Sequence, residues 1–111
     1  MINYDVITFK LPNGKSPFKE WYNSLDSIIQ RRIEKRIARL RRGNFGDHKN
    51  LGDDLLELRL FFGAGYRIYC TVSENVIVVL LSGGDKSNQT KDIQNAKEYL
   101  KNFIEVKNVK D

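Results

Sequence analysis

Cysteine and histidine are nearly absent from this sequence of 111 residues, which holds one of each, Cys70 and His48. A single cysteine excludes a disulfide within the chain, which suits a reducing compartment such as the cytosol. One cysteine and one histidine also cannot supply the paired ligand spacings of a zinc site. We therefore expect no metal and no cofactor. Because Cys70 alternates with Ile68 and Val72, its thiol is predicted to face the core as a small apolar group.

Long apolar runs are absent as well. No segment approaches the roughly 18 consecutive apolar residues of a membrane-spanning helix. The first nine residues lack a basic start, and Asp5 interrupts their apolar positions, so they do not resemble a signal peptide. These two absences predict a cytoplasmic protein without a membrane partner.

Acidic residues are scarce in one part of the chain. Between Arg31 and Arg42 there are seven basic residues and a single acid, Glu34. The net charge is +5 and the pI is near 9.4. Such a balance fits a nucleic-acid ligand, an acidic protein partner, or both. Two interpretations of the basic run stay open, since it can be the solvated face of an amphipathic helix or a surface that holds RNA phosphates.

Periodicity and turn residues predict a mixed α+β fold. The predicted order is a strand, two helices, three antiparallel strands and a last helix (β-α-α-β-β-β-α), with helices against one face of the sheet. Ser16 and Pro17 mark the start of the first helix, Asp26 and Ser27 mark the start of the second, and Gly43 ends the second. Residues 1–104 are predicted to form one domain, and residues 105–111 a frayed tail. The predicted elements cover residues 4–11, 17–24, 27–42, 55–62, 66–73, 76–82 and, from residue 87 or 88, the last helix; residues 44–54 are predicted to be a loop.

Charged side chains share one face of two predicted strands. Side chains alternate with a period of two, so Glu57 and Arg59 lie on the same face as Arg67 and Tyr69. Arg59 and Arg67 can then be neighbours, and two guanidinium groups repel each other unless an acid or an anion lies between them. Either Glu57 or another acid neutralises them, or the pair binds a phosphate, for which arginine supplies planar paired donors. Lys86, just past the end of the next strand, adds a third cation.

Three cations at one place can promote RNA cleavage without a metal. The ribose 2′-hydroxyl attacks its own 3′-phosphate, and the protein orients the reacting groups and stabilises the charge of the transition state. Arginine is a poor base because its pKa is above 12. A separate general base is needed, and the candidates are Lys86, Tyr69, Glu57, Asp92 and His48.

Several short segments resemble those of the RelE/ParE superfamily of toxins, and in particular its phage-derived, HigB-like "addiction module killer protein" branch. The resemblance runs from about Trp21 to Leu100 and includes the predicted order of elements. No single motif is highly specific, but the set in this order is fairly specific. The segments are Leu56-Glu57-Leu58-Arg59, Gly65-Tyr66-Arg67-Ile68-Tyr69 and Gly83-Gly84-Asp85-Lys86-Ser87, followed by Gln89, Asp92-Ile93 and Ala96.

The resemblance implies a toxin of a type II toxin–antitoxin system that cuts mRNA on the ribosome without a metal. It places the catalytic roles on Arg59, Arg67 and Lys86. RelE has a tyrosine early in its C-terminal segment, where this sequence has Asp92 and Ile93, so that role does not carry over. The implied partners are mRNA, the ribosome and a small helix-turn-helix antitoxin. We expect RNA contacts from Arg36, Arg39, Arg42, Tyr69 and Gln89.

Two alternatives of other classes stay open. The ParE branch shares the fold and inhibits DNA gyrase, and a module that only binds RNA or a protein would not be toxic. The basic helix and the segment from Gly83 to Gln89 favour the RNA-cleaving toxin.

Overall fold

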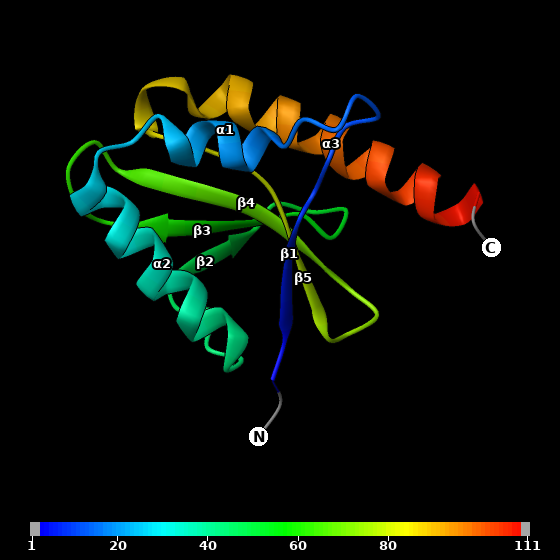
Figure 1. Cartoon of the computed structure of the whole chain (residues 1–111), viewed down its shortest axis with the longest axis horizontal. Helices are drawn as coiled ribbons and strands as arrows, with labels where there is room; N and C mark the ends of the chain where they lie inside the picture. The colour runs from blue at the N-terminus through cyan, green and yellow to red at the C-terminus, as the bar shows by residue number, and fades with distance from the viewer. Residues whose placement is uncertain (1–2, 110–111) are drawn as a thin grey trace.

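The computed structural model describes residues 3–109 and has a mixed α+β fold (Figure 1), which confirms the predicted class. No helix within this range is long and apolar enough to cross a membrane. The elements, in chain order, are β1 (Asp5–Thr8), α1 (Pro17–Asn23), α2 (Ser27–Arg41), β2 (His48–Asn50), β3 (Leu56–Leu60), β4 (Tyr66–Ser73), β5 (Ile77–Gly84), a short 3-10 helix (Lys86–Asn88) and α3 (Gln89–Val109).

The strands form one five-stranded sheet in the order β1-β5-β4-β3-β2. β1 lies parallel to β5, and the other neighbours are antiparallel. Parallel strands need a crossover connection, and α1 and α2 belong to the connection that follows β1. The sequence predicted four strands, and the fifth is β2, which lies within the predicted loop 44–54. That prediction was wrong because three exposed polar residues show no alternation of apolar and polar positions.

Helices cover both faces of the sheet, which corrects the expectation of helices at one face. The first face packs against α1 and α2 through a cluster that includes Phe18, Ile33 and Ile68. The second face packs against α3 through a separate cluster that includes Tyr69 and Leu100. β4 contributes to both clusters because successive side chains point to opposite faces.

The helix starts follow the predicted capping residues. Ser16 accepts a hydrogen bond from the Lys19 amide at α1, and Asp26 accepts from two amides at α2. α3 continues to Val109, so residues 105–109 are helical and the predicted frayed tail is corrected over that range. Residues 110 and 111 of that predicted tail lie outside the described residues.

The interior contains Cys70, as the sequence predicted, and Trp21 packs against it while partly buried. Cys70 is fully buried, and burial raises the pKa of its thiol to about 12, which keeps it neutral and unreactive. Trp21 packs against the first cluster, with its ring centroid 5.8 Å from that of Phe18. Its indole occupies the space beside Gly83, where a methyl group would overlap the ring.

Replacing Gly83 by alanine should therefore destabilise the fold. The added methyl group would displace the Trp21 indole from its packing site, at a cost of about 1–3 kcal/mol. Chemical denaturation of Gly83→Ala against the parent chain measures this. Val76→Ala, at an exposed position before the same strand, is the control and should change the free energy of unfolding by less than about 0.5 kcal/mol. Equal stability of Gly83→Ala and the parent would contradict the packing described for Trp21.

Candidate functional site

The register of β3 and β4 places the predicted cations directly opposite each other. The Cα of Arg59 pairs with that of Arg67, and Glu57 pairs with Tyr69. All four side chains lie on the face that α3 covers, as the alternation of the sequence predicts. The like charges of the two guanidinium groups are thereby brought to one place on the sheet.

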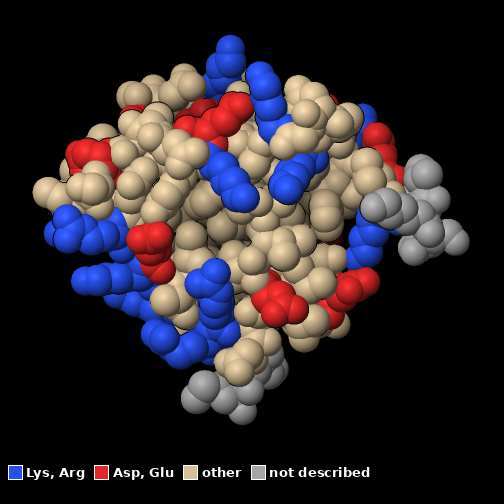
Figure 2. Space-filling view, viewed as in Figure 1, with Lys and Arg blue, Asp and Glu red and all other residues tan. Residues whose placement is uncertain are grey.

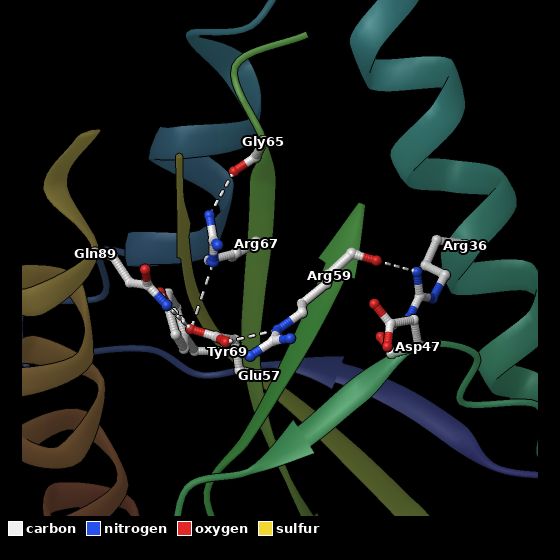
Figure 3. A network of polar contacts seen from close by, with 8 residues as sticks. All are labelled: Arg36, Asp47, Glu57, Arg59, Gly65, Arg67, Tyr69 and Gln89. Atoms are coloured by element: carbon white, nitrogen blue, oxygen red, sulfur yellow. Dashed lines mark hydrogen bonds and ion pairs between the residues drawn. The ribbon is translucent and has the colours of Figure 1, made fainter. Parts of the chain in front are cut away.

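A fully buried carboxylate lies between these arginines (Figure 3). Oε1 of Glu57 accepts a hydrogen bond from Nε of Arg59 at 3.2 Å. Oε2 accepts from the hydroxyl of Tyr69 at 3.2 Å and from Nε2 of Gln89 at 2.9 Å. Nε of Arg67 forms an ion pair with the same oxygen at 3.6 Å. Of the two interpretations that the sequence left open, neutralisation by Glu57 is therefore the one seen in this structure.

The carboxylate engages each arginine through Nε rather than through the tip of the side chain. One terminal nitrogen of Arg67 donates to the carbonyl of Gly65 at 2.9 Å. The terminal nitrogens of Arg59 make no hydrogen bond with any residue in the range 3–109. The Arg59 side chain is 31% exposed and that of Arg67 is 12% exposed. The tip of Arg59 thus keeps donors available for an anionic ligand.

Lys86 lies beside Arg67, at the end of the sheet where β4 begins and β5 ends. Gly65 lies next to both side chains. A methyl group at this glycine would be 3.4 Å from Cβ of Lys86 and 3.7 Å from a terminal nitrogen of Arg67. The Lys86 amide also donates to the carbonyl of Ala64 at 3.3 Å. The structure therefore brings Arg59, Arg67 and Lys86 together where β3 and β5 end and β4 begins.

Two acids near these cations have opposite pKa shifts. Hydrogen bonds from Ser87 lower the pKa of Asp85, and the positive charge of Arg67 lowers it further. Burial raises the pKa of Asp92, which lies on the first turn of α3 against Gly84. Asp85 is thus fixed as an anion, whereas the Asp92 carboxylate binds a proton more readily than an ordinary aspartate.

The predicted general bases occupy different environments. Glu57 is fully buried, accepts three hydrogen bonds and forms an ion pair with Arg67, so a substrate cannot reach it. Burial, followed by the charge of Glu57, raises the pKa of Tyr69, which therefore stays a protonated donor. His48 pairs with Leu58, whose side chain belongs to the opposite face of the sheet. Asp92 is partly exposed and lies against Gly84, the residue that pairs with Arg67 in the sheet, so among these candidates it is the carboxylate best placed to accept a proton.

The residues predicted to contact RNA are separated in space. Tyr69 and Gln89 belong to the Glu57 network and use their polar groups there. Arg36 is buried, and its terminal nitrogens donate to three carbonyls, those of Arg59, Phe45 and Asp47, at 2.6, 2.8 and 2.5 Å.

Arg36 thus connects α2 to β3 and to the preceding loop. Burial, and then the neighbouring charge of Arg39, lowers its pKa. Because its terminal donors are engaged, we no longer assign Arg36 to RNA binding. Arg39 and Arg42 are exposed at the end of α2, where they can meet a ligand.

Lys49 is a cation that the sequence analysis missed. It stands on β2, and its Cα pairs with that of Glu57, so its side chain lies on the face that carries the arginines. The predicted loop gave no basis for assigning it to a face, because only the pairing of β2 with β3 decides this. Within the described residues, no three or more histidines, cysteines or carboxylates gather as metal ligands would.

Comparison with known proteins gives a related sequence and a structure of similar fold. No family model matches the chain. An uncharacterized protein of Haemophilus influenzae is 47% identical over 81 residues, which span 72% of this chain and 82% of that protein. The structure of a mutant of the Escherichia coli toxin RelE in the free state superposes with a TM-score of 0.68, at 17% identity, over 87% of this chain and 97% of RelE. This likeness confirms the RelE-like fold.

Removing the charge of Glu57 should destabilise the protein strongly. Glu57→Gln keeps the shape but leaves two arginines without their shared anion, which should cost about 3 kcal/mol. The exposed pair of Glu74 with Lys107, 3.5 Å apart, provides the matched control. Glu74→Gln should cost less than about 1 kcal/mol. Urea denaturation measures both variants, and equal small effects would show that the buried carboxylate does not organise the site.

Proposed function

Since this chain belongs to the same family as the uncharacterized protein of Haemophilus influenzae and has the fold of RelE, we propose that it is the toxin of a type II toxin–antitoxin system. Its proposed activity is metal-independent cleavage of mRNA on the ribosome, in the cytoplasm. A HigB-like toxin of this kind would be held inactive by a small helix-turn-helix antitoxin.

One observation carries the proposal. Arg59, Arg67 and Lys86 converge at the end of the sheet where β3 and β5 end and β4 begins. The buried carboxylate of Glu57 pairs with both arginines, and Asp85 adds a second negative charge near Arg67. The terminal nitrogens of Arg59 make no hydrogen bond within the described residues, so a phosphate can approach them. Donors of this kind stabilise the extra negative charge that develops on a phosphate during attack.

Glu57 acts as a positioning residue in this proposal. It accepts a hydrogen bond from Nε of Arg59 and forms an ion pair with Arg67, whose terminal nitrogen also donates to Gly65, so both guanidinium groups are oriented before any RNA binds. A preorganised donor costs no reorganisation when the transition state forms. Gln89 and Tyr69 fix the carboxylate in turn, which extends the support to α3 and β4.

Asp92 is the proposed general base. In the reaction, the 2′ oxygen forms a bond to phosphorus, the bond from phosphorus to the 5′ oxygen breaks, and a 2′,3′-cyclic phosphate results. The 2′-hydroxyl proton passes to Asp92, and the departing 5′ oxygen takes a proton from water. A carboxylate whose pKa is raised is a stronger base, which suits this task.

The pairing of both arginines with Glu57 favours a second candidate. A ParE-like inhibitor of DNA gyrase would need no free phosphate site and no general base, so a neutralised arginine pair would not impair it. The same pairing suits a non-toxic module that binds RNA or protein. The length of cellular messages after induction of the gene separates RNA cleavage from the other two functions, and growth arrest separates the gyrase inhibitor from the non-toxic module.

Arg67→Ala should abolish both growth arrest and mRNA cleavage. Its guanidinium is next to Lys86 and would contact the phosphate, and losing such a transition-state donor lowers the rate by about 100-fold or more. Primer extension of messages after brief induction in a bacterium measures cleavage, and circular dichroism establishes that the variant folds. Arg31→Ala, an exposed arginine on α2, is the control and should cut as the parent does.

Two results would contradict the proposal. Cleavage by a folded Arg67→Ala variant at the parental rate would exclude the cation mechanism. DNA damage with intact messages on expression of the parent chain would identify a gyrase inhibitor instead.

Asp92→Asn should lower the cleavage rate and remove its dependence on pH in the acid range. Because the pKa of Asp92 is raised above its ordinary value of 3.8, the parental rate should fall as the pH drops through that higher pKa. Single-turnover cleavage on programmed ribosomes at a series of pH values measures this. Asp53→Asn, in an exposed turn, should keep the parental profile. An unchanged rate and profile in Asp92→Asn would remove Asp92 from the mechanism.

A further inference from the structure

A groove of about 470 Å³ separates α2 from the segment that follows β3. Arg59 is one of its lining residues and also belongs to the Glu57 network, so the two sites adjoin at β3. Within the groove lining, the carbonyl of Arg59 accepts a hydrogen bond from Arg36. The side chain of Arg59 extends to Glu57 (Figure 3). The volume is within the range of roughly 300–1,000 Å³ that is usual for ligand sites.

Three exposed cations line this groove from α2, namely Arg32, Lys35 and Arg39. Their spacings of three and four residues place them on one face of the helix, over roughly 10 Å of its length. None of them forms an ion pair within the described part of the chain. Lysine and arginine side chains gather over the α2 side of the molecule in Figure 2.

The opposite wall of the groove carries aromatic side chains. Phe61 is 76% exposed, the highest exposure among the large apolar residues of the described range. Phe62 is half-buried, and the guanidinium of Arg32 lies 4.5 Å from the centre of its ring. The ring of Phe61 thus stands beside a row of unpaired cations with its surface open to solvent.

We propose that this groove binds single-stranded RNA, with phosphates on the α2 cations and a base stacked on Phe61. Proteins that bind single strands combine a positively charged groove with aromatic rings on which bases stack. The inference deepens the proposed function and rests on it for the identity of the ligand, since an RNA-cleaving toxin must hold the strand beyond the cleaved bond. It places a segment of that strand next to β3, the strand that carries Arg59.

An acidic helix fits the groove less well. Helices that dock in grooves insert apolar anchors at positions one turn apart. Here the apolar surface is limited, because Leu60 is buried and Arg32 covers Phe62. Phe61 is left as a single exposed ring, which suits one stacked base.

The test is a binding measurement with the purified full chain. The probe is a fluorescein-labelled hexamer of 2′-O-methyl uridine, which cannot be cleaved because its 2′ oxygen is blocked. Fluorescence anisotropy at several salt concentrations gives the affinity and its salt dependence. Phe61→Ala should weaken binding by about 5- to 100-fold. Phe61→Leu should weaken it similarly, because leucine is apolar but offers no ring.

Arg39→Ala should weaken binding and reduce the salt dependence by about 0.7 in the slope of log affinity against log salt. The matched controls are Arg31→Ala, an exposed arginine on α2 outside the groove, and Ile28→Ala, an exposed apolar residue on the same helix. Both should bind within about twofold of the parent, since neither lines the groove.

Three outcomes would overturn the groove site. They are parental affinity in Phe61→Ala, an equal loss in Arg31→Ala and Arg39→Ala, and tighter, Phe61-dependent binding of a glutamate-rich helical peptide. Binding is read separately from cleavage. If RNA binds through Phe61 but the parent chain cuts no message, the cleavage proposal fails and the groove stands. If messages are cut but the hexamer binds independently of Phe61, the groove fails and the cleavage proposal stands.

Discussion

The site depends on one buried charge, the carboxylate of Glu57. A carboxylate removed from water must be paired and hydrogen-bonded, or it becomes strongly destabilising. In this chain the partners come from β3, β4 and α3, so the same interaction that satisfies the charge also joins three elements. It holds Arg59 and Arg67 side by side, which their mutual repulsion would otherwise prevent.

A second buried ion organises the other side of β3. The guanidinium of Arg36 donates to the carbonyls of Arg59, Phe45 and Asp47, so α2, β3 and the intervening loop are joined without a carboxylate. Backbone carbonyls satisfy the donors of a buried arginine while its charge is retained. As a result, Arg59 joins the two proposed sites. Its carbonyl accepts a hydrogen bond from Arg36 in the lining of the proposed RNA groove, and its side chain belongs to the proposed catalytic cluster.

Local patterns in the sequence predicted most of the fold. The capping residues Ser16 and Asp26 mark the helix starts, and alternation along β3 and β4 places Glu57 and Arg67 on one face. β2 was missed because its three residues pair through the backbone, and this pairing leaves no pattern in their side chains. The helices were assigned to one face because periodicity reveals an apolar stripe but not the sheet face that it meets.

The sequence by itself determined the class of the fold, the fact that Arg59 and Arg67 share one face, and the excess of cations. These three properties depend on side-chain type and spacing. Only the tertiary structure decided which of those cations remain available. Arg36 is buried against backbone carbonyls, whereas the terminal nitrogens of Arg59 stay open. The structure also decided that His48 lies on the face of the sheet opposite the arginines. The physical reason is that burial and pairing depend on contacts between residues far apart in the chain, which no local pattern encodes.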